Sequence, residues 1–192
     1  IDIATALSGY TAESVVDALR KMRVKFDALF GLNANRLRLE LYMRASDYDA
    51  VYYFGHGLAT SWFGISGVLL TKDNADLLEG KVVYALACYT AQKLGKIAVS
   101  KGARAYLGFT EKVYVAFPES EHDYLKDFIR LWASPPILLA DGWSTGRVYS
   151  YIKGESDKLI KLYEEKYRSG EWANADWYAD AFRWNKNHFV LL

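Results

Sequence analysis

Two short hydrophobic runs, each leading into a reactive side chain, constrain this chain most. The first, Ala50–Phe54, leads through a glycine into His56. The second, Lys81–Ala87, leads into Cys88, the only cysteine of the chain. Both runs are short, rich in β-branched and aromatic residues, and followed by a break, as is typical of buried strands. If they pair as parallel neighbours, an imidazole and a thiol meet at one sheet edge, as a cysteine nucleophile and its base require.

The pattern around these runs alternates between strand and helix periods, which predicts an α/β fold. We expect a mostly parallel central sheet of about six strands with helices on both faces, in three layers. Ligand sites in such sheets lie beyond the carboxyl ends of the strands, where His56 is expected. Further strands are predicted at Ile1–Leu7, Val24–Phe30, Ala103–Phe109 and 188–192, with Lys112–Phe117 as a strand or a loop.

Helices are predicted from the spacing of apolar residues and from capping residues. They are expected from a Thr11 N-cap to Arg23, from an Asn33 cap through Arg44, and over Ala91–Lys101, Glu119–Ala133, Ile137–Ser150 and Asp157–Arg168. Pro135 and Pro136 are expected to end the fourth of these helices. A small hairpin is predicted from Trp62–Ile65 and Gly67–Leu70.

Composition favours one globular domain over residues 1–192. Hydrophobic residues make up 52% and charged residues 24% of the chain, enough for a substantial core. The formal net charge of +1 does not favour a nucleic-acid partner. No apolar run approaches the ~20 residues that cross a bilayer, and no signal peptide is visible, so we expect no membrane span and a cytoplasmic location. The start at Ile1 without Met suggests a piece of a longer chain.

A cysteine nucleophile needs a neighbouring group that favours its deprotonation, because only a few per cent of a free thiol is thiolate at pH 7. A neighbouring imidazole is such a group and later protonates the leaving amine. Gly57 allows a carbonyl oxygen to approach its backbone N–H, so the amides of Gly57 and Cys88 are the expected oxyanion hole. The helix expected from Ala91 would add a positive partial charge near Cys88.

Each feature also has a plain structural interpretation. A single cysteine is usually a small buried hydrophobe, and a single histidine is usually a surface or core residue; the same holds for His122 and His188. Ser66 and Ser100 lack a Gly-x-Ser-x-Gly elbow, and the Gly55–Gly57 stretch lacks the lysine and third glycine of a phosphate loop. No metal or cofactor is expected. The Trp-rich tail is either a partner surface or a terminal helix and strand docked on the core.

The blocks Val51–Gly57 and Val82–Cys88 resemble the two signature blocks of caspase-fold cysteine peptidases. In that group hydrophobic residues lead into His-Gly, and a second hydrophobic strand leads into Ala-Cys. The chain is most similar to the CHAT and gingipain-like branches. Further similar stretches are Tyr48-Asp49, Gly102–Phe109 and the closing Trp184…Leu191 strand, so the resemblance spans nearly the whole chain.

The resemblance implies that His56 is the catalytic base and acid, Cys88 the nucleophile and Gly57 an oxyanion donor. It also places substrate-binding residues beside the thiol and after the fifth strand: Leu86, Tyr89, Phe109, Thr110 and Glu111. Leu86 replaces the polar residue often found two positions before the cysteine, and Tyr89 and Thr90 replace the small residue after it. An apolar or aromatic-lined P1 pocket is therefore expected rather than specificity for Asp. Glu111 either selects a basic P1 residue or is an exposed loop charge.

Three functions follow from these observations. The first is a cysteine endopeptidase that acts through an acyl-thioester intermediate. The second is a caspase-like domain without activity that binds partners, which the replacements at Leu86 and Tyr89 favour. The third, a flavodoxin-like binding domain, is disfavoured by the missing phosphate loop. The expected partners are a peptide or protein substrate and a second copy of the chain, paired through an edge strand.

Overall fold

Sheet A contains the two hydrophobic runs as neighbouring strands in the computed structural model, which describes residues 3–116 and 122–192. β1 (Ala50–Phe54) pairs in parallel with β5 (Val82–Leu86), and β5 pairs in parallel with β6 (Ala105–Phe109). β7 (Phe189–Leu191) joins β6 in the antiparallel direction. The predicted α/β class and parallel pairing are confirmed. The sheet has four strands in the described residues, in the order β1-β5-β6-β7, instead of about six.

Sheet B is a small antiparallel meander that directly follows β1. It consists of β2 (His56–Leu58), β3 (Ser61–Gly64) and β4 (Gly67–Leu70), so the predicted hairpin is confirmed. Trp62 is 1% exposed, and its ring stacks on that of Tyr53 in β1 with centroids 4.5 Å apart. This stack joins sheet B to sheet A.

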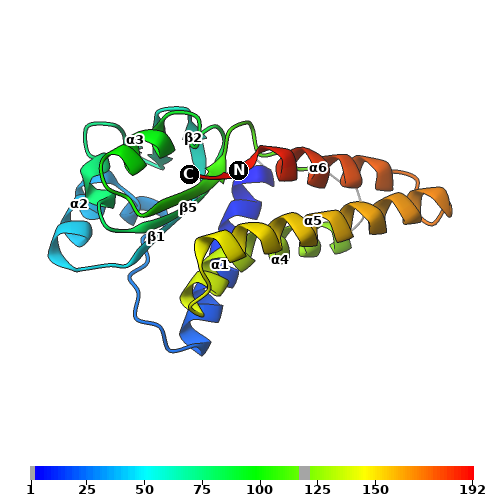
Figure 1. Ribbon diagram of the computed structural model, residues 1–192, viewed down its shortest axis with the longest axis horizontal. Coiled ribbons are helices and arrows are strands. Elements are labelled where there is room, and N and C mark those ends of the chain that lie inside the picture. Colours follow the sequence, from blue (N-terminus) through cyan, green and yellow to red (C-terminus); the bar gives the residue numbers. More distant parts are fainter. Residues whose placement is uncertain (1–2, 117–121) are drawn as a thin grey trace.

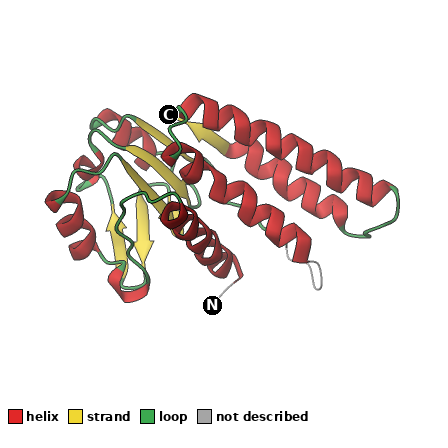
Figure 2. Cartoon of the chain, turned by 90° about the horizontal axis from the view of Figure 1, so that it is seen from below, coloured by secondary structure: helices red, strands yellow, loops and turns green. Residues whose placement is uncertain are grey.

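The two faces of sheet A are covered by different helices (Figures 1 and 2). Side chains of β5 alternate between the faces, as in any strand. Tyr84 and Leu86 belong to the core cluster with α4 (His122–Ala140), α5 (Thr145–Arg168) and α6 (Ala175–His188). Val83 and Ala85 belong to the cluster with α3 (Leu94–Ser100) and sheet B. The connections between these elements and α1 (Ile3–Lys21) contain α2 (Arg36–Ala45) and the 3-10 turns Gly31–Asn33 and Ala75–Leu78.

The first predicted strand is wrong, because α1 runs over Ile3–Lys21. Its buried stripe continues at four-residue spacing through Leu7, Thr11, Val15 and Leu19, which is a helical period. Thr11 is therefore inside the helix and not its N-cap. Its hydroxyl donates to the Leu7 carbonyl at 2.7 Å, a back-bond that satisfies a buried hydroxyl in mid-helix.

The predicted strand Val24–Phe30 is also wrong, although the alternation behind it is real. Val24 and Phe26 pack in a cluster with Tyr52 of β1, whereas Lys25 is exposed. The segment is not a strand. Its alternating sequence reflects the alternating burial of its side chains, and the backbone does not pair with a neighbouring strand. Residues 112–116 likewise form no strand, and Phe117 lies outside the described residues.

Helix α4 continues through Pro135 and Pro136, which the sequence predicts as its end. A proline removes the N–H that would bond the carbonyl four residues earlier. Both carbonyls have other donors here. The Ser134 hydroxyl donates to Leu131 O at 2.6 Å, and the Tyr84 hydroxyl donates to Trp132 O at 2.7 Å. The cost of the two prolines is therefore offset by one local and one long-range hydrogen bond.

Other helix boundaries move by a few residues. Asn35, rather than Asn33, caps α2 by accepting from the Arg38 N–H at 3.0 Å. The predicted helix Ile137–Ser150 is divided, since its first part completes α4 and α5 begins at Thr145. The tail docks on the core as a helix and a strand, α6 and β7, as one of the two interpretations expected.

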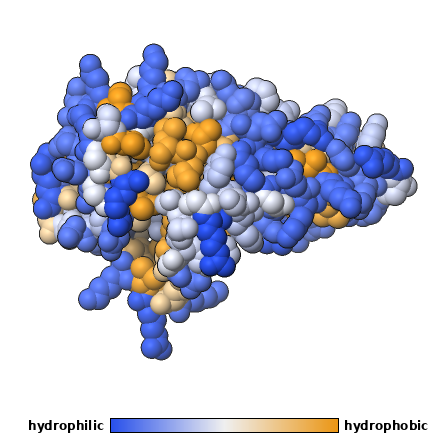
Figure 3. All heavy atoms as spheres, in the orientation of Figure 1, coloured by the Kyte–Doolittle hydropathy of each residue, from blue (hydrophilic) through white to orange (hydrophobic). Residues whose placement is uncertain are grey.

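Helices α4, α5 and α6 form an arm that extends away from sheet A (Figures 1 and 2). On the face drawn in Figure 3, the arm is mostly hydrophilic, whereas apolar side chains gather over the sheet end of the molecule. None of the helices in the described residues has the length and apolar character that crossing a bilayer requires.

Lys153 ties the arm to the sheet at the point where α6 becomes β7. Its half-buried ammonium donates to the Phe189 carbonyl at 2.8 Å and to the Lys186 carbonyl. Burial, with the nearby Lys186 charge, lowers the pKa of Lys153, and Asp157 opposes this change. The cation lies at the C-terminal end of α6, where the helix dipole favours positive charge.

Lys153→Met should therefore lower the free energy of unfolding by about 1–2 kcal/mol, because two carbonyls lose a charged donor. Lys158→Met on the same helix is the matched control. Lys158 is 75% exposed and forms a surface ion pair with Glu155, so its loss should cost no more than about 0.5 kcal/mol. Urea unfolding of both variants measures the difference, and equal losses would contradict the role of Lys153.

Candidate active site

His56 and Cys88 lie at the carboxyl ends of neighbouring parallel strands and line one cavity. The register of β1 and β5 aligns Phe54 with Leu86, so both strands end at the same level of the sheet. The cavity has a volume of about 50 Å³. Its lining residues are Thr5, Ser8, Gly55, His56, Leu86, Ala87, Cys88, Val113, Val115 and Phe128.

The His56 ring is exposed and contacts the first turns of α1. Its Nε2 lies 2.8 Å from the Thr5 hydroxyl oxygen. A hydroxyl both donates and accepts, so this contact suits either tautomer of the imidazole. It fixes the orientation of the ring over the cavity. The sequence carries no signal for this pairing, because Thr5 and His56 are brought together only by the packing of α1.

Tyr53 supports the turn that carries His56. Its hydroxyl lies 2.6 Å from the His56 carbonyl and 2.7 Å from the Phe63 carbonyl, which share its proton, and it accepts from the Phe63 N–H at 3.0 Å. Burial raises the pKa of Tyr53, so the phenol stays protonated and remains a donor. One side chain of β1 thus fixes the start of sheet B and with it the backbone of His56.

The turn after Cys88 contains a residue in an unusual backbone conformation. Tyr89 has a φ of 63°, in the left-handed region, which costs a non-glycine residue about 1–2 kcal/mol. Its N–H donates to the Glu111 carbonyl at 3.0 Å, and its carbonyl accepts from the Gln92 N–H at 2.9 Å. These two hydrogen bonds hold the turn and so hold the half-buried thiol of Cys88 at the cavity.

The Cys88 sulfur accepts a hydrogen bond from the N–H of Val113 at 3.4 Å. This donor comes from the irregular segment 112–116, which sequence patterns did not connect with the thiol. The predicted start of the next helix at Ala91 is wrong, because residues 88–93 form turns and α3 begins at Leu94. The first N–H groups of α3, from Leu94 and Gly95, donate to the Ala59 and Thr90 carbonyls.

Gly57 is packed directly against the turn that contains Cys88. A Cβ at this position would lie 2.4 Å from Cγ2 of Thr90 and 2.7 Å from the Cys88 carbonyl oxygen. Only glycine allows the two backbones to approach this closely. The close approach brings the two expected oxyanion residues, Gly57 and Cys88, into contact.

The predicted substrate-binding residues occupy different places. Leu86 lines the cavity, and Tyr89 and Glu111 are hydrogen-bonded to each other beside Cys88. Thr110 donates its N–H to the His188 carbonyl at 2.9 Å, and its own carbonyl accepts from Gln92. Phe109 is fully buried between the rings of Trp132 and Phe189, so it supports the core and does not line the cavity.

No group of three or more His, Cys, Asp or Glu side chains in residues 3–116 and 122–192 is arranged to hold a metal ion. A larger hollow of about 460 Å³ lies between α1 and α4. Its lining is Ser14, Lys126, Ile129, Arg130, Ala133, Ser134, Ile137 and Leu138. That set lacks a nucleophile paired with a base, so we place the candidate chemistry at the smaller cavity.

Comparisons with protein-family models, curated proteins and solved structures give no significant match.

Gly57→Ala should lower the free energy of unfolding by about 1–3 kcal/mol, because the new methyl group has to displace the Cys88 turn. Gly154→Ala in α5 is the matched control. A Cβ there meets nothing within 4 Å, so the change should raise stability by up to about 1 kcal/mol. Thermal unfolding of both variants gives the comparison. A neutral effect of Gly57→Ala would show that β2 and the Cys88 turn do not need their close approach.

Proposed function

We propose that the chain is a cysteine peptidase that hydrolyses peptide bonds through Cys88 and His56. One observation carries the proposal: the parallel register of β1 and β5 brings the only thiol and an imidazole to one cavity. The contact of Gly57 with the Cys88 turn adds support, since it gathers the expected oxyanion donors. The resemblance of the two strand blocks to caspase-fold cysteine peptidases supports the same function. We also propose, on the same resemblance, that the α/β fold of this chain is the caspase-like one.

In the proposed hydrolysis, His56 carries out each proton transfer. His56 takes the proton of the Cys88 thiol, and the sulfur attacks the carbonyl carbon of the scissile bond. The N–H groups of Gly57 and Cys88 stabilise the negative oxygen of the tetrahedral intermediate. His56 then donates the proton to the leaving amine, which leaves an acyl thioester on Cys88. Water, deprotonated by His56, attacks this thioester and releases the acid and the thiol.

The cavity restricts how a substrate reaches Cys88. Its volume of about 50 Å³ is far below the ~300 Å³ of the smallest usual ligand pockets. Its walls come from α1, through Thr5 and Ser8, and from segment 112–116, through Val113. A peptide therefore binds only if one of these walls moves. The apolar Leu86 and Val113 beside the thiol favour an apolar P1 side chain.

A second candidate function is a partner-binding domain without peptidase activity. The small cavity favours it, and so does the contact between His56 Nε2 and the Thr5 hydroxyl, which occupies one ring nitrogen of the base. In this function His56 and Cys88 are structural residues. Neither candidate requires a metal or another cofactor.

Covalent labelling with peptide acyloxymethyl ketones tests the peptidase directly. We expect the wild-type chain to be labelled once, at Cys88, with apolar P1 probes preferred, and to cleave a P1-varied peptide library. Cys88→Ala should abolish both, and His56→Asn should slow both by at least about 100-fold, because proton transfer is lost. Equal labelling of the wild type and Cys88→Ala would rule the peptidase out.

Alkylation by iodoacetamide distinguishes the two functions. Because Cys88 is the only cysteine, the urea-unfolded chain is its own reference for an ordinary thiol. A peptidase should be alkylated at pH 7 about tenfold faster when folded than when unfolded, because the imidazole favours the thiolate. Alkylation that is no faster in the folded chain supports the binding domain.

A further inference from the structure

Segment 112–116 is held on its outer side by two helices of the arm. Trp184 of α6 donates its indole N–H to the Lys112 carbonyl at 2.8 Å. At the other end, the Tyr124 hydroxyl of α4 accepts from the Ala116 N–H at 3.1 Å. Between them, Tyr114 exchanges two hydrogen bonds with the side chain of Asn185, with distances of 2.8 Å and 2.7 Å.

The segment alternates like a strand, although it pairs with none. The side chains of Val113 and Val115 line the cavity, whereas those of Lys112 and Tyr114 are exposed. The Tyr114 N–H and C=O both bond to Asn185, while the N–H of the residue before it reaches the Cys88 sulfur. The amide of Asn185 thus occupies the place that a neighbouring strand would have in a ladder.

We propose that Asn185 is a positioning residue for the Cys88 nucleophile, acting through Tyr114 to place the N–H of Val113 on the sulfur. The proposal rests on the proposed function, because it concerns the same thiol. A hydrogen bond to the charged form of a group favours that form. The Val113 N–H therefore favours the thiolate, and it does so only while segment 112–116 is held at its present distance from Cys88.

The burial of Asn185 strengthens this inference. The side chain is fully buried, where a polar group is costly unless it is hydrogen-bonded. Both of its polar atoms are used on a single residue of the segment. An apolar residue would fill the same space between α6 and the segment. It would not hold Tyr114 in one register, however, and so would not fix which N–H of the segment faces the Cys88 sulfur.

The test measures the rate of Cys88 alkylation by iodoacetamide against pH in three variants. Asn185→Leu removes both hydrogen bonds to Tyr114. Val113→Pro deletes the N–H that reaches the sulfur and leaves α6 unchanged. Each should move the midpoint of the pH profile upward by about one pH unit, the effect of losing one hydrogen bond to a charged group. The double variant should move it no further, because both changes remove the same interaction.

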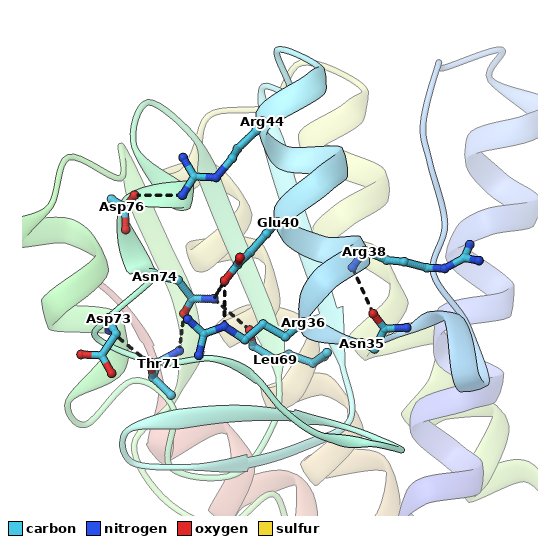
Figure 4. Close-up of polar contacts among 10 residues, drawn as sticks. All are labelled: Asn35, Arg36, Arg38, Glu40, Arg44, Leu69, Thr71, Asp73, Asn74 and Asp76. Atoms are coloured by element: carbon cyan, nitrogen blue, oxygen red, sulfur yellow. Dashed lines mark hydrogen bonds and ion pairs between the residues drawn. The ribbon is translucent and has the colours of Figure 1, made fainter.

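Asn74, which lies between β4 and the 3-10 turn Ala75–Leu78, provides the control (Figure 4). This second buried asparagine also bridges a loop. It donates to the Leu69 carbonyl at 3.0 Å and to the Glu40 carboxylate at 3.1 Å, and it accepts from the Thr71 N–H at 2.8 Å. Asn74→Leu should cost at least as much stability as Asn185→Leu, because it removes three hydrogen bonds. It should leave the pH midpoint of alkylation within about 0.2 pH unit of the wild type, since the hydrogen bonds of Asn74 go to Leu69, Thr71 and Glu40 and not to the segment that contacts Cys88.

A midpoint that stays unchanged in Val113→Pro overturns the proposal, and so does an additive shift in the double variant or an equal shift in Asn74→Leu. If Asn185→Leu does not fold, Asn185→Ala replaces it. The smaller neutral side chain also removes both hydrogen bonds to Tyr114 and adds no charge near the thiol, so the same upward shift of about one pH unit is expected, and no shift overturns the proposal. Alkylation needs no substrate turnover. A missing peptidase activity with the expected shifts therefore rejects the proposed function alone, and activity without the shifts rejects only the role of Asn185.

Discussion

The parallel pairing of β1 with β5 is the constraint on which the rest of the site depends. Strand pairing fixes which residues leave the sheet side by side, and a slip of one residue would move every side chain to the other face. Here both strands bury alternate residues in two different cores, so the register is strongly determined. The ends of the strands, and with them the positions of His56 and Cys88 along the sheet edge, follow from that register.

The arm depends on the same sheet. The Tyr84 hydroxyl, which projects from β5, bonds to the carbonyl that Pro136 leaves without its usual donor in α4. At the far end of the chain, Lys153 of α5 joins the last turn of α6 to β7. Both contacts couple the position of the helices to the strands. The helices in turn hold the segment that contributes the Val113 N–H to the cavity.

The sequence predicts what depends on local patterns. The runs that became β1 and β5, the hairpin of sheet B and the last strand carry strong alternation or apolar runs, and they form as expected. The failures have different causes. Thr11 looks like a helix cap only when the residues before it are predicted as a strand, whereas Leu7 lies in the same helix and accepts the Thr11 hydroxyl. Pro135 and Pro136 are predicted to end the helix, because the group that replaces the lost donor to the Trp132 carbonyl, the Tyr84 hydroxyl, belongs to a strand far away in the sequence.

The candidate site divides in the same way. Its two proposed catalytic side chains, His56 and Cys88, lie at strand ends, and sequence periodicity locates these ends. The groups that contact these side chains do not lie at strand ends. The Thr5 hydroxyl comes from α1, and the Val113 N–H comes from a segment without regular structure. Neither has a sequence signature, because a hydroxyl or a backbone amide acquires its role only by its distance from the reacting atom. In the mechanism we propose, the reactivity of Cys88 therefore depends less on the residues adjacent to it than on how firmly α1 and α6 hold the Thr5 hydroxyl and the Val113 N–H in place.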